Sequence, residues 1–353
     1  MNLDPQTVDN RKIWLDLMRI AAAFAVVLTH VTRQGVVSHA ASDSLFSWLS
    51  LVFYNSCVRW QNGVFFMISG ALLLGKDRSI SKLYKKNILR IAAAYFAWSA
   101  IYTVLWSNNL HGTWSLLKKI IDGKEFLWFL PKIAGLYMLT PVFRLIVKNK
   151  RCTKYYLLIT FIFCFINDQA AGIIGLFSRR LSSLISESFS HFGLGLHAYC
   201  FYFVWGYCLS NIKINRKRQR IITSLGLLGF ASTVAGTVLF SVIKGRPVFI
   251  LWNHSTVNAL LEATLVFTLF RKLFENRSFS EKAQGIITKA SKWTFGIYLI
   301  HFNIIYILKK FGISALSFAP IISAPILAVF IFAVSMLISA ILNKIPIVNK
   351  YIV

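Results

Sequence analysis

The stretch Trp14-LDLMRIAAAFAVVLTH-Val31 is long and apolar enough to cross a bilayer as a helix, yet it contains Arg19 and His30, eleven positions apart. Eleven residues are almost a whole number of α-helical turns. The two side chains therefore point within roughly 20° of each other and lie about 16 Å apart along the axis. Asp16, three residues before Arg19, falls on the same stripe and can pair with the guanidinium. The stretch predicts a membrane helix with one polar stripe.

Ionisable side chains at membrane depth are costly, and they persist mainly where they face a bundle interior, a water-filled path or each other. Two interpretations of the stripe stay open. Asp16 and Arg19 form a structural ion pair while His30 caps the far end of the helix, or the stripe lines a reaction path. Histidine suits proton transfer near neutral pH, and the planar fork of arginine suits phosphate or carboxylate. His30, Arg19 and Asp16 are therefore our candidate catalytic residues.

The composition is that of a membrane protein. Hydrophobic residues make up 56% of the 353 positions and charged residues 14%, and the mean hydropathy is +0.61, which a soluble domain does not show. The net charge of +27 is divided into short basic runs between apolar stretches, where it reports topology, and no nucleic-acid signature accompanies it. The five cysteines lack a CxxC pair, so we predict neither a disulfide framework nor a metal site.

Apolar stretches of spanning length number about ten, which predicts an all-α polytopic fold. Short connections leave no room for a soluble domain, so we expect a single transmembrane domain over 1–353, with an N-terminal tail at 1–13 and a C-terminal tail at 344–353. The second stretch is too long for one straight helix and is polar in its middle, which predicts a break there. The stretches are 14–31, 48–74, 91–107, 127–147, 155–175, 196–212, 221–243, 254–274, 293–310 and 319–343.

The orientation follows from the lysines and arginines in alternate loops. The set that includes both termini contains 25 of them, and the opposite set contains 10. Basic residues are enriched in cytoplasmic loops, so an even number of spans with both termini in the cytoplasm is expected. In that orientation His30 lies nearer the outer face than Arg19.

Two arginines and a pair of small residues are further candidates. Arg59 shortly precedes the segment Gly63-VFFMISGAL-Leu73, in which Ser69 and Gly70 either allow close helix approach or make room for a thin substrate arm. Their spacing alone does not decide between these. Arg90 immediately precedes an apolar run, and we expect it to point inward.

Four other residues are weaker candidates for the site. Trp128 and Tyr137 lie in one short span, where aromatic residues at the start are most often interface anchors. His301 lies deep within an apolar run, where a structural role is the simpler interpretation and a second catalytic group the alternative. Glu262 is the only glutamate well inside a span, so it is a candidate for pairing or proton relay.

Four features together resemble one known family. They are Asp16-LMR followed by His30, in an R-x10-H spacing, then Val64-FFMISGALL, Leu127-WFLPKIAGLYMLTP and Ser291-KWTFGIYLIH. In this order they resemble the membrane acyltransferase-3 family, whose members move acyl groups onto carbohydrates of the bacterial envelope. The likeness is greatest to the stand-alone O-acetyltransferases of surface carbohydrates, which lack a fused hydrolase-like domain.

The resemblance implies acetyl-CoA as a cytoplasmic co-substrate, with no permanently bound cofactor, and an acceptor hydroxyl at the outer face. The acceptor is an envelope polysaccharide or a polyprenyl-linked oligosaccharide, and the location is the bacterial inner membrane, among its lipids. By the same resemblance His30 acts as a general base or a transient acyl carrier, Arg19 and Asp16 position His30 or the donor, and Arg59 and Arg90 hold phosphate or carbonyl oxygens.

Two other classes of function fit the sequence. An exporter or flippase of a lipid-linked glycan also needs buried charged residues, but it needs no acetyl-CoA. A membrane sensor or scaffold tolerates neutral replacements of Arg19 and His30. The sequence does not identify the acceptor, and it leaves acetyl and succinyl transfer both open.

Overall fold

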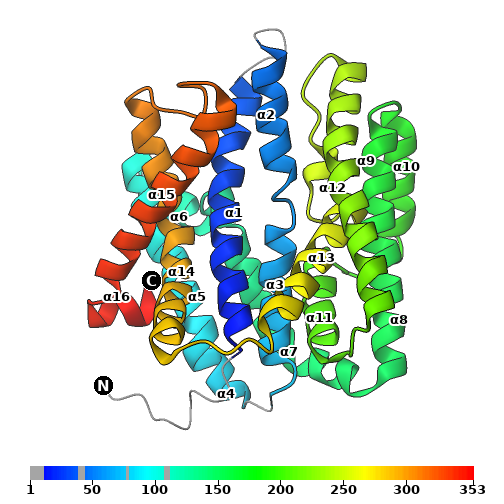
Figure 1. Ribbon diagram of the computed structural model, residues 1–353, viewed down its shortest axis with the longest axis horizontal. Helices are drawn as coiled ribbons and strands as arrows, with labels where there is room; N and C mark the ends of the chain where they lie inside the picture. Colours follow the sequence, from blue (N-terminus) through cyan, green and yellow to red (C-terminus); the bar gives the residue numbers. More distant parts are fainter. Residues whose placement is uncertain (1–11, 39–43, 77–78, 107–111) are drawn as a thin grey trace.

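The computed structural model describes residues 12–38, 44–76, 79–106 and 112–353, and every regular element in these ranges is a helix (Figure 1). The longer elements are α1 (Ile13–Ser38), α2 (Leu45–Ser56), α3 (Gln61–Leu73), α5 (Leu89–Trp106), α6 (Thr113–Asp122), α7 (Phe129–Lys148), α8 (Lys150–Phe161), α9 (Asn167–Gly175), α10 (Arg179–Ser190), α11 (Ala198–Asn211), α12 (Arg216–Lys244), α13 (Val257–Phe274), α14 (Glu281–Lys310) and α15 (Pro320–Leu342). The short ones are α4 (Ile80–Leu83), η2 (Tyr84–Ile88), η3 (Glu125–Leu127), η4 (Ile162–Ile166), η5 (Ile250–Trp252) and α16 (Pro346–Tyr351).

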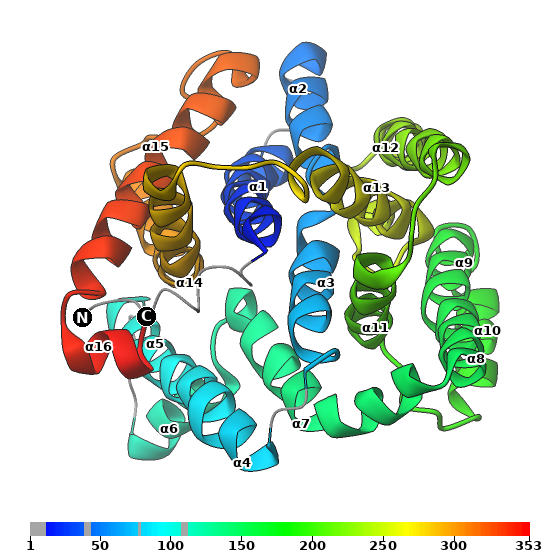
Figure 2. The ribbon, with the colours of Figure 1, turned by 60° about the horizontal axis from the view of Figure 1, so that its bottom comes forward.

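Helix α1 lies at the centre of the bundle, with α2, α3, α13, α14 and α15 around it (Figure 2). Its buried residues include Met18, Ala22 and Ala25, none more than 1% exposed. Small residues such as these alanines let neighbouring helices approach closely within a membrane. The central position means that the polar stripe of α1 faces other helices.

Six helical segments in the described ranges are long and apolar enough to cross a membrane, namely Ile13–Val37, Ile80–Trp106, Glu125–Lys148, Lys150–Gly175, Arg216–Lys244 and Pro320–Leu342. The fold is therefore the all-helical, multi-pass membrane fold that the sequence predicts. The predicted number of ten spans stays a prediction. The break in the second stretch is confirmed, because α2 ends at Ser56 and α3 begins only at Gln61.

The two ends of the bundle differ in charge. The loops after α7, α11 and α13, which belong to the basic set, lie at the end where α1 begins, whereas the loops after α12 and α14 lie at the opposite end (Figure 1). We call these the basic end and the far end. The basic residues predict that the basic end faces the cytoplasm.

Two helices, α6 and α10, were not expected from the sequence. Both lie in predicted loops, and neither has a buried residue. Each is amphipathic and too short to span a membrane, so a count of long apolar stretches passes over it.

The C-terminal residues are packed against the bundle, although the sequence predicts a plain tail at 344–353. They form the short helix α16, and the side chain of Val353 is fully buried. Arg90 donates from Nη2 to the carbonyl oxygen of Val353, and Trp98 donates from Nε1 to that of Ile352 at 3.1 Å. The predicted N-terminal tail lies almost wholly outside the described residues.

Helices α3 and α11 cross in direct backbone contact. A Cβ atom at Gly70 would overlap the carbonyl oxygen of Phe203, and one at Gly206 would overlap that of Met67. Ser69, next to Gly70, donates to the carbonyl oxygen of Phe65 at 3.0 Å. The structure thus gives Gly70 a packing role, which is the first of the two interpretations left open by its sequence.

We expect Gly70→Ala to destabilise the protein by about 1–3 kcal/mol, because the added methyl group forces two helix backbones apart. Gly135→Ala in α7 is the matched control, since no atom lies within 4 Å of the added Cβ and alanine favours a helix by about 0.5–1 kcal/mol. The measurement is the melting temperature of each purified variant in detergent. Equal melting temperatures would show that the crossing tolerates a side chain.

Candidate functional site

His30 of α1 and His301 of α14 lie side by side. Their ring centroids are 5.3 Å apart, with an angle of 35° between the ring planes. His301 is fully buried, whereas His30 is only partly buried. The two histidines that the sequence places deep within apolar stretches therefore belong to one site, although 270 residues of chain separate them.

The hydrogen bond of His301 fixes where its proton lies. Nδ1 is 3.0 Å from the carbonyl oxygen of Ile297, and since a carbonyl oxygen only accepts, Nδ1 carries the hydrogen. In the neutral ring Nε2 then has a lone pair. No donor among the described residues lies within hydrogen-bond distance of Nε2. The site therefore includes a buried, unsatisfied proton acceptor beside His30.

Aromatic rings form a wall on one side of the pair. Phe302 lies 4.4 Å from His30 and stacks on Phe126 at 4.0 Å, and Trp106 stacks on Tyr306 at 4.5 Å. Tyr298 donates to the carbonyl oxygen of Phe126 at 2.5 Å, so the start of the α7 segment is held against α14. Rigid apolar walls of this kind exclude water and strengthen electrostatic interactions inside a site.

Arg59 lies in the break between α2 and α3 and is 5% exposed. Nε donates to the carbonyl oxygen of Asn55 at 2.9 Å, Nη2 to Asn55 Oδ1, and Nη1 to the carbonyl oxygen of Trp252 at 3.3 Å. The guanidinium also stands 4.9 Å from the centroid of the Trp252 ring. A guanidinium has five N–H groups, so two of them have no partner among the described residues.

The break also links Arg59 to His30. The amide nitrogen of Asn55 donates to the carbonyl oxygen of Thr29 at 2.9 Å and to the hydroxyl of Thr32 at 2.7 Å, and Thr29 precedes His30. Arg59 is close enough to interact electrostatically with both His30 and Glu262. The polar break in the second span thus places the Arg59 guanidinium near the two histidines.

Glu262 of α13 completes the polar surroundings of Arg59. It is fully buried, and Oε1 lies 2.5 Å from the hydroxyl of Thr233 in α12. No donor in the described part of the chain reaches Oε2. The same hydroxyl accepts from Asn258 at 2.7 Å, which ties α12 to α13. Glu262 therefore links α13 to α12 and also interacts electrostatically with Arg59.

Asp16 and Arg19 meet α14 near the basic end. Asp16 is 4% exposed and accepts from the hydroxyl of Ser291 at 2.6 Å. Arg19 Nη1 lies 3.4 Å from Asp16 Oδ1 and donates to Ser291 Oγ at 3.1 Å. The predicted pairing of Asp16 with Arg19 is confirmed. The pair also ties α1 to α14, which the sequence did not show.

Arg90 and Tyr137 lie near the start of α14, at the basic end, and away from the two histidines. The Arg90 guanidinium is 5.2 Å from the centroid of Phe295, one turn after Ser291, and it interacts electrostatically with Tyr137. Arg59 and Arg90, which the sequence treats as one set, therefore occupy two different depths.

Trp128 begins a second aromatic group beside the site. Its ring stacks on His254 with centroids 5.2 Å apart, and Phe66 lies 6.4 Å from it. Lys132, one turn further along α7, stands 5.6 Å from the ring of Tyr199. Trp128 is thus part of an aromatic and cationic surface rather than an isolated interface anchor.

Several residues of the site were missed by reasoning from the sequence. Asn55 lies in the polar break of the second stretch, and its position there was the one feature of the sequence that could have marked it as a site residue. Trp252, His254 and Phe302 carry no signal of their own, since aromatic residues are common throughout this chain.

The fold and the site define a helical membrane protein with two histidines and an arginine gathered inside its bundle. The family model for an acyltransferase domain matches residues 12–344, nearly the whole chain. The chain therefore belongs to the acyltransferase-3 family and is a membrane acyltransferase. No curated protein and no solved structure matches it.

Proposed function

We propose that the protein transfers an acetyl group from acetyl-CoA to a hydroxyl of a bacterial envelope polysaccharide, free or lipid-linked. The observation that carries this proposal is the contact of His30 with His301, at a ring distance of 5.3 Å, beside a buried arginine. A buried cluster with a proton acceptor and a partly unused guanidinium suits acyl transfer.

In the proposed step His30 takes the proton of the acceptor hydroxyl as its oxygen attacks the thioester carbonyl carbon. The new C–O bond forms, the C–S bond breaks, and the thiolate of CoA takes the proton back from His30. His301 lies beside His30 with a free lone pair on Nε2, which can accept the N–H of the His30 ring and orient that ring. The products are an O-acetyl ester and free CoA.

Arg59 serves the reacting carbonyl in this proposal. It donates to Asn55, which bonds the residue next to His30, and it retains two N–H groups without partners among the residues described. Donors aimed at the oxygen that gains charge in the transition state are among the strongest catalytic contributions. Arg59 is therefore assigned to this oxyanion rather than to the phosphates of CoA.

The donor enters from the basic end, which the loop charges predict to be cytoplasmic. Arg19, with Asp16 and Ser291, and Arg90 with Tyr137 lie at this end, where cations suit the phosphates of CoA. Eleven helical residues, about 16 Å, separate Arg19 from His30, a distance of the order of an extended pantetheine arm.

The acceptor reaches His30 from the far end. The aromatic surface around Trp128 and His254 suits a sugar ring, because flat apolar faces stack on aromatic rings while polar groups at the edge bond hydroxyls. The setting is the bacterial inner membrane. In this proposal the protein acts like the stand-alone enzymes of the family, such as the enterobacterial common antigen O-acetyltransferase.

The test is transfer of label from acetyl-labelled acetyl-CoA to glycan or lipid-linked glycan in membranes that contain the protein. We expect labelled ester that mild alkali releases, and free CoA in equal amount. A glycan that reaches the outer face only when the protein is present, without any label, would instead indicate an exporter.

A further inference from the structure

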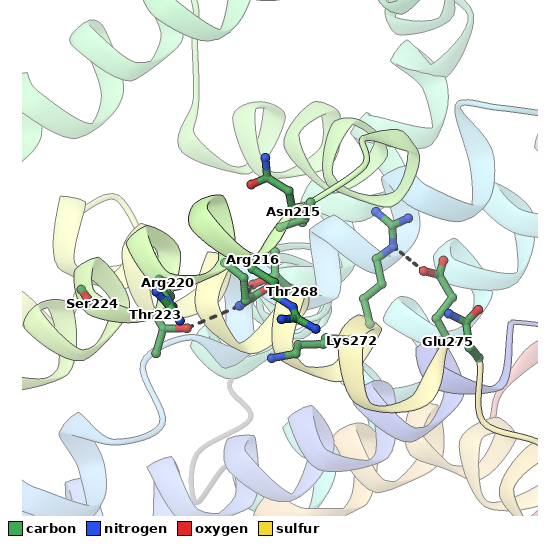
Figure 3. A pocket seen from close by; sticks show the side chains of 12 residues that line it. Asn215, Arg216, Arg220, Thr223, Ser224, Thr268, Lys272 and Glu275 are labelled. Atoms are coloured by element: carbon green, nitrogen blue, oxygen red, sulfur yellow. Dashed lines mark hydrogen bonds and ion pairs between the residues drawn. The ribbon is translucent and has the colours of Figure 1, made fainter.

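A cavity of about 870 Å³ lies between the ends of α12 and α13 (Figure 3). Its lining comes from the first turns of α12, the last turns of α13 and the loop before α12. These elements are at the basic end. The cavity is separate from the site described above, because α13 stands between it and α1. Phe267 of α13 packs against Trp14 of α1, with ring centroids 5.2 Å apart.

The two helices present matching polar stripes to this cavity. On α12 the lining positions are 216, 219, 220, 223 and 224, and on α13 and the turn directly after it they are 268, 271, 272, 275 and 276. Both sets follow the spacing i, i+3, i+4, i+7 and i+8, which is one face of a helix. Two polar helix faces do not pack tightly against each other, and their polar groups stay accessible. They therefore indicate a site for a polar ligand.

Two glycines of α12 explain why α12 and α13 are in close contact along most of their length and separate only at the basic end. A Cβ at Gly226 would overlap the side chain of Leu265, and one at Gly229 would lie 2.9 Å from the carbonyl oxygen of Asn258. From this level toward the far end the helices are in close contact. One turn nearer the basic end the glycines stop, bulkier polar residues begin, and the helices enclose the cavity.

Of the four cationic side chains that line the cavity, one is bonded to other residues and three make no bond with a described residue. Arg271 pairs with Glu275 at 2.8 Å and donates to the carbonyl oxygens of Leu209 and Ile212, so it holds α11 to α13. By contrast, Arg216, Arg220 and Lys272 are exposed and make no hydrogen bond or ion pair with any described residue. The cavity thus carries a surplus of positive charge.

The floor of the cavity offers neutral polar groups. Gln219 is 9% exposed, and its amide nitrogen is 3.4 Å from the hydroxyl of Thr223 and 3.5 Å from that of Thr268. These long contacts leave the amide weakly held. A floor of amide and hydroxyl groups beneath three cations matches the oxygens of a phosphate group.

We propose that this cavity binds a phosphate group, as a phosphoester or phosphodiester. Exposed apolar residues adjoin it on the membrane-facing sides of the two helices, including Leu225 and Leu269. They favour the headgroup of an anionic phospholipid over a soluble phosphate, since acyl chains would lie along them. Basic pockets between membrane helices at the cytoplasmic side are a general means of binding such headgroups. The proposal does not depend on the acyl-transfer chemistry.

The test compares three variants of the full chain in detergent micelles. The first removes the charge, as Arg216→Gln/Arg220→Gln/Lys272→Gln. The second keeps it, as Arg216→Lys/Arg220→Lys/Lys272→Arg. The third removes three exposed cations of the same end outside the cavity, as Lys217→Gln/Lys282→Gln/Lys289→Gln. Each is titrated with short-chain phosphatidylglycerol, short-chain phosphatidylcholine and inorganic phosphate, and the rise in melting temperature is followed.

We expect phosphatidylglycerol to stabilise the wild type, the charge-keeping variant and the outside variant at similar concentrations. The first variant should need about a hundredfold more or show no rise. The same pattern with inorganic phosphate alone would support the phosphate site and assign it to a soluble ligand. Equal titrations of the first and third variants, or no response of the wild type to either probe, would overturn the proposal.

Discussion

His30→Gln is expected to lower acetyl transfer by about 10²–10⁴-fold, the range that a positioned general base contributes. Glutamine keeps a polar side chain of similar reach but cannot take up the proton of the acceptor hydroxyl. The readout is labelled glycan formed from acetyl-labelled acetyl-CoA in membranes with equal amounts of protein. The variant should still insert, because the contacts of His30 are with the rings of Phe302 and His301, and glutamine fills much of the same space.

His191→Gln is the matched control for this prediction, since His191 is an exposed histidine at the end of α10. Its transfer rate should equal that of the wild type. Undiminished turnover in His30→Gln would contradict the base role. Trapping of an acetyl group on His30 itself, found by mass spectrometry of the protein after a short reaction, would replace direct transfer with a covalent intermediate.

Arg59→Leu is expected to destabilise the fold by about 3–5 kcal/mol, the cost of removing one member of a buried charged network. The change leaves Asn55 Oδ1 and the Trp252 carbonyl oxygen without their donor, and it leaves Glu262 without its neighbouring cation. Loss of the folded, monodisperse fraction after heating in detergent is the measurement. Transfer activity should also fall in the molecules that survive.

Arg59→Lys separates charge from geometry. Lysine keeps the cation near Glu262 but lacks the planar fork that contacts Asn55 and Trp252, so stability should recover in part while transfer stays low. Arg246→Leu, an exposed arginine in the loop after α12, is the control and should melt like the wild type. Wild-type melting of Arg59→Leu would mean that the network contributes little to the fold.

The parts of the structure that the sequence predicts are those with a local signal. Helical spacing puts Arg19 and His30 on one stripe, and the polar run from Asn55 to Asn62 predicts the break between α2 and α3. His301 stands out because a histidine inside an apolar run is rare. Each of these follows from the cost of placing polar groups in a membrane.

The parts that could not be predicted depend on which helices touch. The sequence does not show that Asp16 meets Ser291, since the contact spans 275 residues and many serines lie in apolar stretches. Nor does it show that Val353 is buried, because short terminal segments take their structure from what they pack against.

The hydrogen bond between Asp16 and Ser291 has a consequence at the other end of the same two helices. Because α1 and α14 both begin at the basic end, this contact sets the register of one against the other. A slip of α14 by one residue would shift His301 by about 1.5 Å and turn it by about 100°, which would take its ring away from His30. The contact of Asp16 with Ser291 near the basic end thus determines how His30 and His301 align further along the same two helices.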